Sequence, residues 1–268
     1  MSLLSSAQTH DLVALQKFCD SLATPIVVIG ALAYQAFISG SHRYTVDVDV
    51  AMALELDEYD RFKDKLIEDG WEHDRNQEQR WRGPSGSMVD ILPTGPKARR
   101  VGHITWPESE MRMSLVGFEH VFLDAVHFEL APGFRMKVVP PPVLFLLKVV
   151  AFLDDEQRRA KDLEDIHGLV KLYEWESERL YSEEVFDAEL PDIQFAPAFL
   201  LALEVGKICN PEELRLVRSF LARARNTAFP LFHTLLTYEG RTAEAEQTMA
   251  QRLEVFELGL NTSEQKLL

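Results

Sequence analysis

The hydrophobic positions in the first half of the chain follow two different periods, which predicts a mixture of strands and helices. β-Branched runs and alternation of apolar with polar residues predict strands over residues 25–30, 44–53 and 87–92 and a hairpin over 125–130 and 134–139. Apolar residues three and four positions apart predict helices over 11–22, 31–38 and 57–68. Asp57 is the expected N-cap of the last helix. Val46, Val48 and Val50 are expected to face the core.

The second half of the chain shows only the helical period. Apolar spacing predicts helices over residues 141–153, 161–175, 197–205, 211–225 and 242–258, and three of these begin at a proline. We therefore predict an α/β domain over residues 1–140, followed by an all-helical domain over residues 141–268.

Composition and charge narrow the class of protein. The chain has 268 residues, of which 46% are hydrophobic, enough for one large domain or two modest ones. Its 28 basic and 43 acidic residues give a net charge of −15, which excludes broad coating of nucleic acid because such a surface repels phosphate. The two cysteines form no CxxC motif, and no apolar stretch reaches transmembrane length. We expect a cytoplasmic protein without a membrane partner.

Two acidic residues share one side of a predicted strand. Asp47 and Asp49 are two positions apart, so their side chains project to the same face, with Cα atoms roughly 6.5–7 Å from each other. Two neighbouring carboxylates repel each other unless solvent or a cation screens them. The pair is either a ligand set for a divalent ion or two solvated acids on an edge strand, and the pattern alone leaves both open.

The surroundings of this pair favour chemistry on phosphate. Gly30 ends one predicted strand and a helix starts at Ala31, so the turn exposes backbone N–H groups that suit a phosphate. A third acid, Asp90, lies between Val89 and Ile91 in another apolar strand. Together these features suggest metal-assisted phosphoryl or nucleotidyl transfer, with two metal ions about 3.5–4 Å apart.

The same segments resemble a known superfamily. Residues 28–31 (Val-Ile-Gly-Ala), residues 43–50 with the Asp-Val-Asp motif, and residues 89–91 (Val-Asp-Ile) resemble the polymerase-β-type nucleotidyltransferases. Residues 144–148 and 159–166 are similar to the AbiEii group, the toxin component of some bacterial abortive-infection systems. The likeness covers roughly residues 25–170. It implies a nucleotidyltransferase core with a mixed sheet, an α/β (α+β) fold, ahead of the helical domain.

The resemblance assigns roles in the first domain. It implies that Asp47 and Asp49 bind Mg²⁺, and that Asp90 is a third ligand or the base for an acceptor hydroxyl. The turn at Gly30 and Ala31 would hold the triphosphate of a nucleotide. Ala31 departs from the Gly or Ser that is usual in this turn, so a phosphate-binding hydroxyl is missing while the backbone N–H groups remain.

Further residues are assigned to nucleotide binding by the same resemblance. Lys148, on the first helix of the second domain, would contact the nucleotide phosphates. Asp162 or Asp165 would complete the helix motif by orienting Lys148. Arg43 and Thr45 flank the Asp-Val-Asp strand, and the resemblance weakly favours a site role for both.

The implied activity is Mg²⁺-dependent transfer of a nucleoside monophosphate from an NTP to an acceptor hydroxyl. An RNA 3′ end, such as that of tRNA, or a protein side chain is the implied acceptor, and an antitoxin is the implied partner. The window over residues 75–103 has a net charge of +4 and either docks an anionic acceptor or is a solvated loop. The alternatives are a small-molecule nucleotidyltransferase of the antibiotic-modifying type and a non-catalytic nucleotide-binding module.

Overall fold

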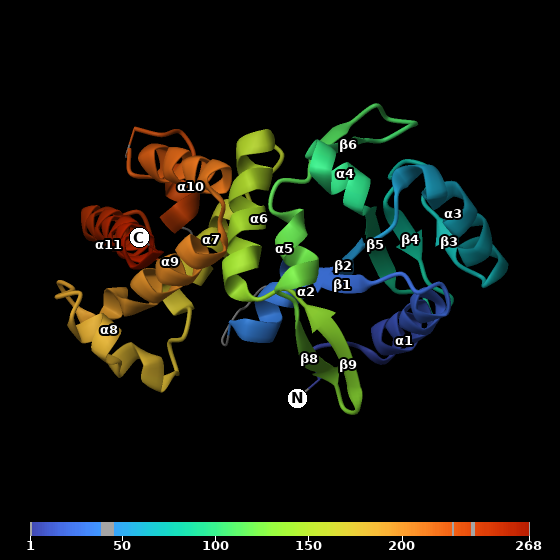
Figure 1. The fold of residues 1–268 in the computed structure, drawn as a ribbon, viewed down its shortest axis with the longest axis horizontal. Helices are drawn as coiled ribbons and strands as arrows, with labels where there is room; N and C mark the ends of the chain where they lie inside the picture. The colour runs from blue at the N-terminus through green and yellow to red at the C-terminus, as the bar shows by residue number, and fades with distance from the viewer. Residues whose placement is uncertain (1, 39–45, 227, 237–238, 268) are drawn as a thin grey trace. The chain divides into compact units, whose positions relative to one another are not determined.

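The structure is a computed structural model that describes the chain except residues 1, 39–45, 227, 237–238 and 268. The chain divides into two compact units, Met1–Pro140 and Pro141–Leu268 (Figure 1). The first unit contains both strands and helices, and in the second unit only helices are found among the described residues. The predicted fold class is therefore confirmed.

A mixed sheet forms the centre of the first unit. Its seven strands, counted over the described residues, follow the order β3 (Glu72–His73), β4 (Arg80–Arg82), β5 (Met88–Pro93), β2 (Asp47–Met52), β1 (Ile26–Ile29), β9 (Phe134–Val138) and β8 (Val126–Ala131). Strand β2 is parallel to β5 and antiparallel to β1, and β1 is parallel to β9. Two further strands, β6 (His103–Thr105) and β7 (Arg112–Ser114), form a separate ribbon.

The helices of the first unit correct two expectations. They are α1 (Ser6–Ser21), α2 (Gly30–Phe37), α3 (Tyr59–Glu68), α4 (Pro96–Val101) and α5 (Phe118–Leu123). Helix α1 begins well before residue 11, because Ser5 and Gln8 form a capping box at its start. Asp57 is not the N-cap of α3: it lies inside a short 3₁₀ turn, Leu56–Glu58, and Glu58 precedes the helix without a side-chain cap.

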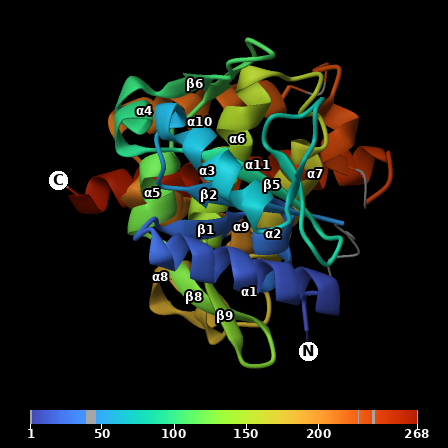
Figure 2. The ribbon, with the colours of Figure 1, turned by 90° about the vertical axis from the view of Figure 1, so that its right-hand side faces the viewer.

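One face of the sheet carries the core of the first unit. Val48, Val50, Val89 and Trp81 are fully buried on this face. The indole Nε1 of Trp81 donates a hydrogen bond to the Tyr59 hydroxyl of α3 over 3.0 Å. Helices α1 and α3 pack together through Phe18 and Phe62, whose ring centroids are 5.3 Å apart, and Figure 2 shows both helices on the side nearest the viewer.

The expectation for Val46 was wrong. Val48 and Val50 are buried as predicted, whereas Val46 is 67% exposed. Strand β2 begins only at Asp47, so Val46 lies before the ladder that would have fixed its side chain toward the core. The alternation of the sequence is therefore structurally meaningful from Asp47 onward.

The second unit is built on apolar helices. Its helices are α6 (Pro141–Asp154), α7 (Asp162–Leu172), α8 (Glu183–Phe186), α9 (Ala196–Ile208), α10 (Pro211–Ala224) and α11 (Ala243–Leu267), with 3₁₀ turns at Glu178–Tyr181, Ile193–Phe195 and Phe232–Leu236. Helices α6 and α9 are buried on nearly every side, as expected for helices that are apolar all round. Helix α11 approaches α9 closely at Gly259, where an added Cβ would lie 2.6 Å from the Phe199 carbonyl oxygen.

Candidate active site

Strand register brings the three predicted aspartates onto one face of the sheet. Asp49 of β2 is paired with Ile29 of β1 on one side and with Asp90 of β5 on the other, and Asp90 is paired with Arg80 of β4. Residues directly opposite each other in a sheet project to the same face. Asp47 is two positions from Asp49 and shares that face. We call Asp47, Asp49, Asp90 and Arg80 the acid cluster.

Arg80 joins two of the aspartates from neighbouring strands. Its Nε donates to Asp90 Oδ1 over 2.8 Å, and its Nη2 donates to Asp90 Oδ2 over 2.9 Å and to Asp47 Oδ2 over 2.7 Å. The side chains are partly shielded from water, with exposed fractions of 22% for Arg80, 12% for Asp90 and 36% for Asp47. The hydrogen bonds from Arg80 to Asp90, together with the charges of the three aspartates, raise the pKa of the guanidinium above its usual value.

Sequence reasoning did not foresee this place for Arg80. Arg80 belongs to the window over residues 75–103, which the sequence predicts either to dock an anionic acceptor or to be a solvated loop, whereas the structure places Arg80 among the acids. The signal was present in the alternation of Arg80, Trp81 and Arg82, which is the period of a strand. Because the strand has only three residues, that period spans too few positions to be distinctive.

Gly30 allows the Asp49 carboxylate to lie against the start of α2. Gly30 has a φ of +66°, in the left-handed region that side chains rarely adopt, and a Cβ added to it would lie 2.1 Å from Asp49 Oδ2. The glycine is therefore required both for its backbone conformation and for the space it leaves. The Ala31 methyl group is buried, so at this position a phosphate can be contacted only by the backbone.

The acid cluster has the donor chemistry that Mg²⁺ requires. Magnesium prefers carboxylate oxygens, and the cluster supplies them from two adjacent strands. A single nitrogen, Arg80 Nη2, contacts oxygens of both Asp47 and Asp90, so one cation can touch both carboxylates at once. Within the described residues, no three acidic, histidine or cysteine side chains are already arranged as a complete metal site. The acid cluster therefore suits Mg²⁺ in its carboxylate donor atoms and in having one position from which a cation contacts both Asp47 and Asp90.

A second group of predicted residues forms a buried ion-pair network in the second unit. Lys148 Nζ of α6 lies 2.7 Å from Asp162 Oδ1 and 2.8 Å from Asp165 Oδ2, both on α7. All three side chains are at most 7% exposed. Arg159 Nε also donates to Asp162 Oδ2 over 2.6 Å. The structure thus shows both aspartates in contact with Lys148, which is the geometry needed for them to orient it.

Comparison with known families decides the assignment. The family model described as "Nucleotidyl transferase AbiEii toxin, Type IV TA system" matches residues 13–228, which is most of the chain and includes the acid cluster and the Lys148 network. The chain belongs to the AbiEii family. The chain is accordingly a nucleotidyltransferase, as the sequence motifs indicated.

Solved structures are less similar to this chain than the family model is. An antigenic nucleotidyltransferase-like protein from Paracoccidioides brasiliensis is 17% identical, with a TM-score of 0.43, covering 72% of this chain and 94% of the other. JHP933 from Helicobacter pylori is 16% identical (TM-score 0.38; 98% and 96% covered), and the antibiotic-resistance factor ANT(2'')-Ia is 10% identical (TM-score 0.34; 98% and 100% covered). No curated protein matches the chain. Because these TM-scores are below 0.5, the assignment rests on the family model.

Two predicted nucleotide-binding residues lie outside the described part of the chain. Arg43 and Thr45 fall within residues 39–45, so their predicted roles stay predictions. In the basic window, the cations at Arg75, Arg82, Lys97 and Arg100 are exposed. Arg99, in contrast, pairs with Glu119 at 2.7 Å, so it and Arg80 are both held in ion pairs.

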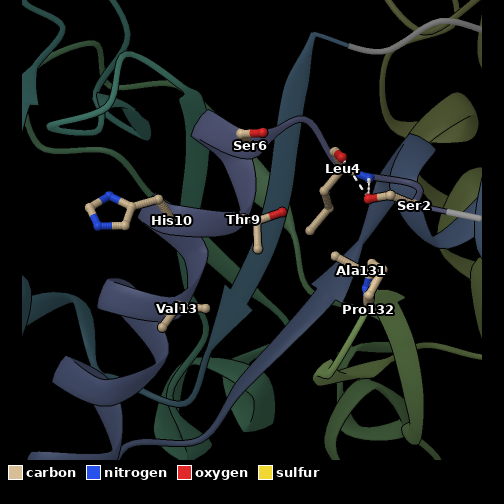
Figure 3. Close-up of a pocket in the computed structure, with 8 residues that line it drawn as sticks. All are labelled: Ser2, Leu4, Ser6, Thr9, His10, Val13, Ala131 and Pro132. Carbon is tan, nitrogen blue, oxygen red and sulfur yellow. Dashed lines mark hydrogen bonds between the residues drawn. The ribbon is translucent and has the colours of Figure 1, made fainter.

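A separate cavity of about 530 Å³ lies beside the N-terminal end of α1 (Figure 3). It is lined by Ser2, Leu4, Ser6, Thr9, His10, Val13, Ala131 and Pro132. This lining contains hydroxyl groups and one imidazole but no carboxylate and no predicted site residue, so the cavity is not part of the acid cluster.

In the described part of the chain, no helix is both long enough and apolar enough to span a membrane.

Proposed function

We propose that this AbiEii-family nucleotidyltransferase requires Mg²⁺ and transfers a nucleoside monophosphate from an NTP to the 3′ hydroxyl of an RNA such as tRNA. The observation that carries the proposal is the acid cluster, in which Asp47, Asp49 and Asp90 share one sheet face beside the Gly30 turn. The family membership supplies the class of reaction, and the metal, the nucleotide and the RNA are the parts that we propose.

The proposed reaction forms one phosphorus–oxygen bond and breaks another. The acceptor hydroxyl oxygen attacks the α-phosphorus, the bond from that phosphorus to the bridging oxygen breaks, and pyrophosphate leaves with the bonding electrons. Asp90 takes the hydroxyl proton or serves as the third metal ligand. Asp47 and Asp49 are the residues that would hold Mg²⁺, one ion or two. When bound, Mg²⁺ neutralises charge on the triphosphate.

The remaining assigned residues would bind and orient the nucleotide. The turn at Gly30 and Ala31 would hold the triphosphate through backbone N–H groups, because the first N–H groups of a helix have no partner within it. Lys148 would contact the phosphates, with Asp162 and Asp165 fixing its ammonium group. Arg43 and Thr45 would contribute from the segment before β2. These contributions are positioning and charge neutralisation.

The exposed positive charge of the basic window supports an anionic acceptor over a small molecule of the antibiotic type. Arg75, Arg82, Lys97 and Arg100 are exposed in the window that also contains Asp90. Such a group of cations favours the approach of a polyanion on an otherwise acidic chain. The type IV toxin–antitoxin description of the family supports an antitoxin as the biological partner, acting in the cytoplasm.

A transfer assay tests the proposal. The protein is incubated with each α-³²P-labelled NTP, Mg²⁺ and total tRNA, beside Asp49→Ala and a control, Asp60→Ala, which removes an 83% exposed acid of α3. We expect wild type and Asp60→Ala to label tRNA, and Asp49→Ala to lose about 100-fold or more of the rate.

Other outcomes of the assay separate the alternatives. Label on an aminoglycoside but not on tRNA supports a small-molecule enzyme. An NTP that raises the melting temperature with Mg²⁺, without transfer to RNA, protein or aminoglycoside, supports a nucleotide-binding module. If no NTP has either effect at millimolar concentration, the metal–nucleotide assignment is wrong.

A further inference from the structure

The acid cluster contains its own cation. Arg80 makes three hydrogen bonds to two carboxylates that come from different strands, β2 and β5. Both oxygens of Asp90 accept from the same guanidinium, and Oδ2 of Asp47 accepts from Nη2. These three oxygens are among those that a metal ion would need as ligands.

The neighbouring residue Trp81 fixes the strand that carries Arg80. Trp81 is fully buried, and its Nε1 donates to the Tyr59 hydroxyl on the core face. Because side chains alternate along a strand, anchoring Trp81 on one face presents Arg80 to the other. The guanidinium itself stands at the end of a flexible side chain that is 22% exposed. It can therefore leave the carboxylates without any movement of β4.

Charge counting shows why the guanidinium matters to a metal ion. The three aspartates carry a formal charge of −3, which Arg80 reduces to −2. A divalent ion that enters the cluster is therefore attracted more weakly than it would be by the three aspartates alone. The ion must also displace the charge-assisted hydrogen bonds that Arg80 donates to Asp47 and Asp90.

We propose that Arg80 is a built-in counter-cation that competes with the divalent metal ion for Asp47 and Asp90. This inference rests on the proposed function, because it takes the acid cluster to be the metal site. Arg80 keeps the carboxylates paired and weakens metal binding, so it sets the concentration of metal at which the site fills. If Arg80 had only a structural role, its ion pairs with Asp47 and Asp90 would stabilise the fold equally in the presence and in the absence of the metal ion.

Direct metal binding measures the competition. Mn²⁺ is titrated into the whole protein and followed by electron paramagnetic resonance, for wild type, Arg80→Gln and Arg80→Lys. The matched control is Arg82→Gln, which removes the same charge two positions along β4 from an exposed side chain. We expect Arg80→Gln to bind Mn²⁺ about tenfold more tightly, and Arg82→Gln to change the affinity less than about threefold, because Arg80 donates hydrogen bonds to Asp47 and Asp90 whereas the Arg82 side chain is exposed. Arg80→Lys keeps the charge but not the planar fork, and is expected to fall between wild type and Arg80→Gln.

Thermal melting supplies a second readout. In metal-free buffer, Arg80→Gln is expected to melt below wild type, because Asp90 loses its partner, and added Mn²⁺ is expected to raise its melting temperature more than that of wild type. If Arg80→Gln does not fold, Arg80→Lys carries the comparison. Equal Mn²⁺ affinities for wild type and the Arg80 variants would contradict the proposal that Arg80 competes with the metal ion. They would not contradict the assignment of the acid cluster as a metal site. Absence of Mn²⁺ binding in every protein overturns the metal site as well.

Discussion

At the scale of single residues, Gly30 connects the chain's local conformation to its chemistry. Its left-handed φ of +66° turns the chain from β1 into α2, and its missing side chain leaves room for the Asp49 carboxylate. The turn and the acid are therefore interdependent, although they are separated by nearly twenty residues in the sequence. A substitution at Gly30 should disturb both.

Replacing Gly30 with alanine should cost more than the left-handed backbone alone explains. The new Cβ would meet Asp49 Oδ2 at 2.1 Å, so the carboxylate or the turn must move. The matched control is Gly86→Ala, where φ is +91° and an added Cβ meets nothing within 4 Å. We expect Gly86→Ala to lose about 1–2 kcal/mol of unfolding free energy in urea, and Gly30→Ala to lose clearly more. Equal losses would show that Asp49 does not depend on the space at Gly30.

At the scale of elements, long periodic segments were predictable and short ones were not. Strands β1, β2 and β5 and the main helices were found because their apolar residues repeat over several positions. Strands β3 and β4 have two and three residues, too few to establish a period. Helix α11 continues to Leu267, beyond the predicted end at residue 258, because Gly259 does not cap the helix but lies inside it, where an added Cβ would be 2.6 Å from the Phe199 carbonyl oxygen of α9.

Some residues of the candidate site could be placed from the sequence, and others could not. Asp47, Asp49 and Asp90 could be placed on one sheet face from alternation and from the resemblance to a family. Arg80 could not, because its position depends on the pairing of β4 with β5, which is a contact between strands rather than a local pattern. The two contacts of Lys148 to Asp162 and Asp165 likewise required the packing of α6 against α7.

We expect the buried ion pairs of Lys148 to contribute to the stability of the second unit. Lys148→Met removes the cation that faces two buried carboxylates, so we expect a loss of about 3–5 kcal/mol of unfolding free energy. The control is Arg158→Met, in which a 71% exposed cation is removed from the segment between α6 and α7, with an expected change below about 1 kcal/mol. Urea denaturation followed by circular dichroism measures both. A loss at Lys148 as small as that at Arg158 would mean that the network contributes little to stability.

At the scale of the whole molecule, the two halves of the chain differ both in net charge and in secondary structure. Residues 1–150 hold 20 acidic and 15 basic residues, and residues 151–268 hold 23 and 13, so two-thirds of the net charge of −15 lies in the helical part. We propose that the two compact units are separate domains, with the acid cluster and the basic window in the first. The overall acidity therefore argues against broad coating of nucleic acid, and not against the docking of one RNA end.

Paired isotopic labels distinguish transfer of the α-phosphoryl group with its nucleoside from transfer of the terminal phosphate. The protein is incubated with Mg²⁺, total tRNA and one NTP labelled either at the α-phosphorus or at the γ-phosphorus. We expect the α label to become attached to RNA and the γ label to appear in pyrophosphate, and we expect Asp49→Ala to abolish both. Attachment of the γ label to the acceptor, or equal transfer by Asp49→Ala, would contradict the proposed nucleotidyl transfer.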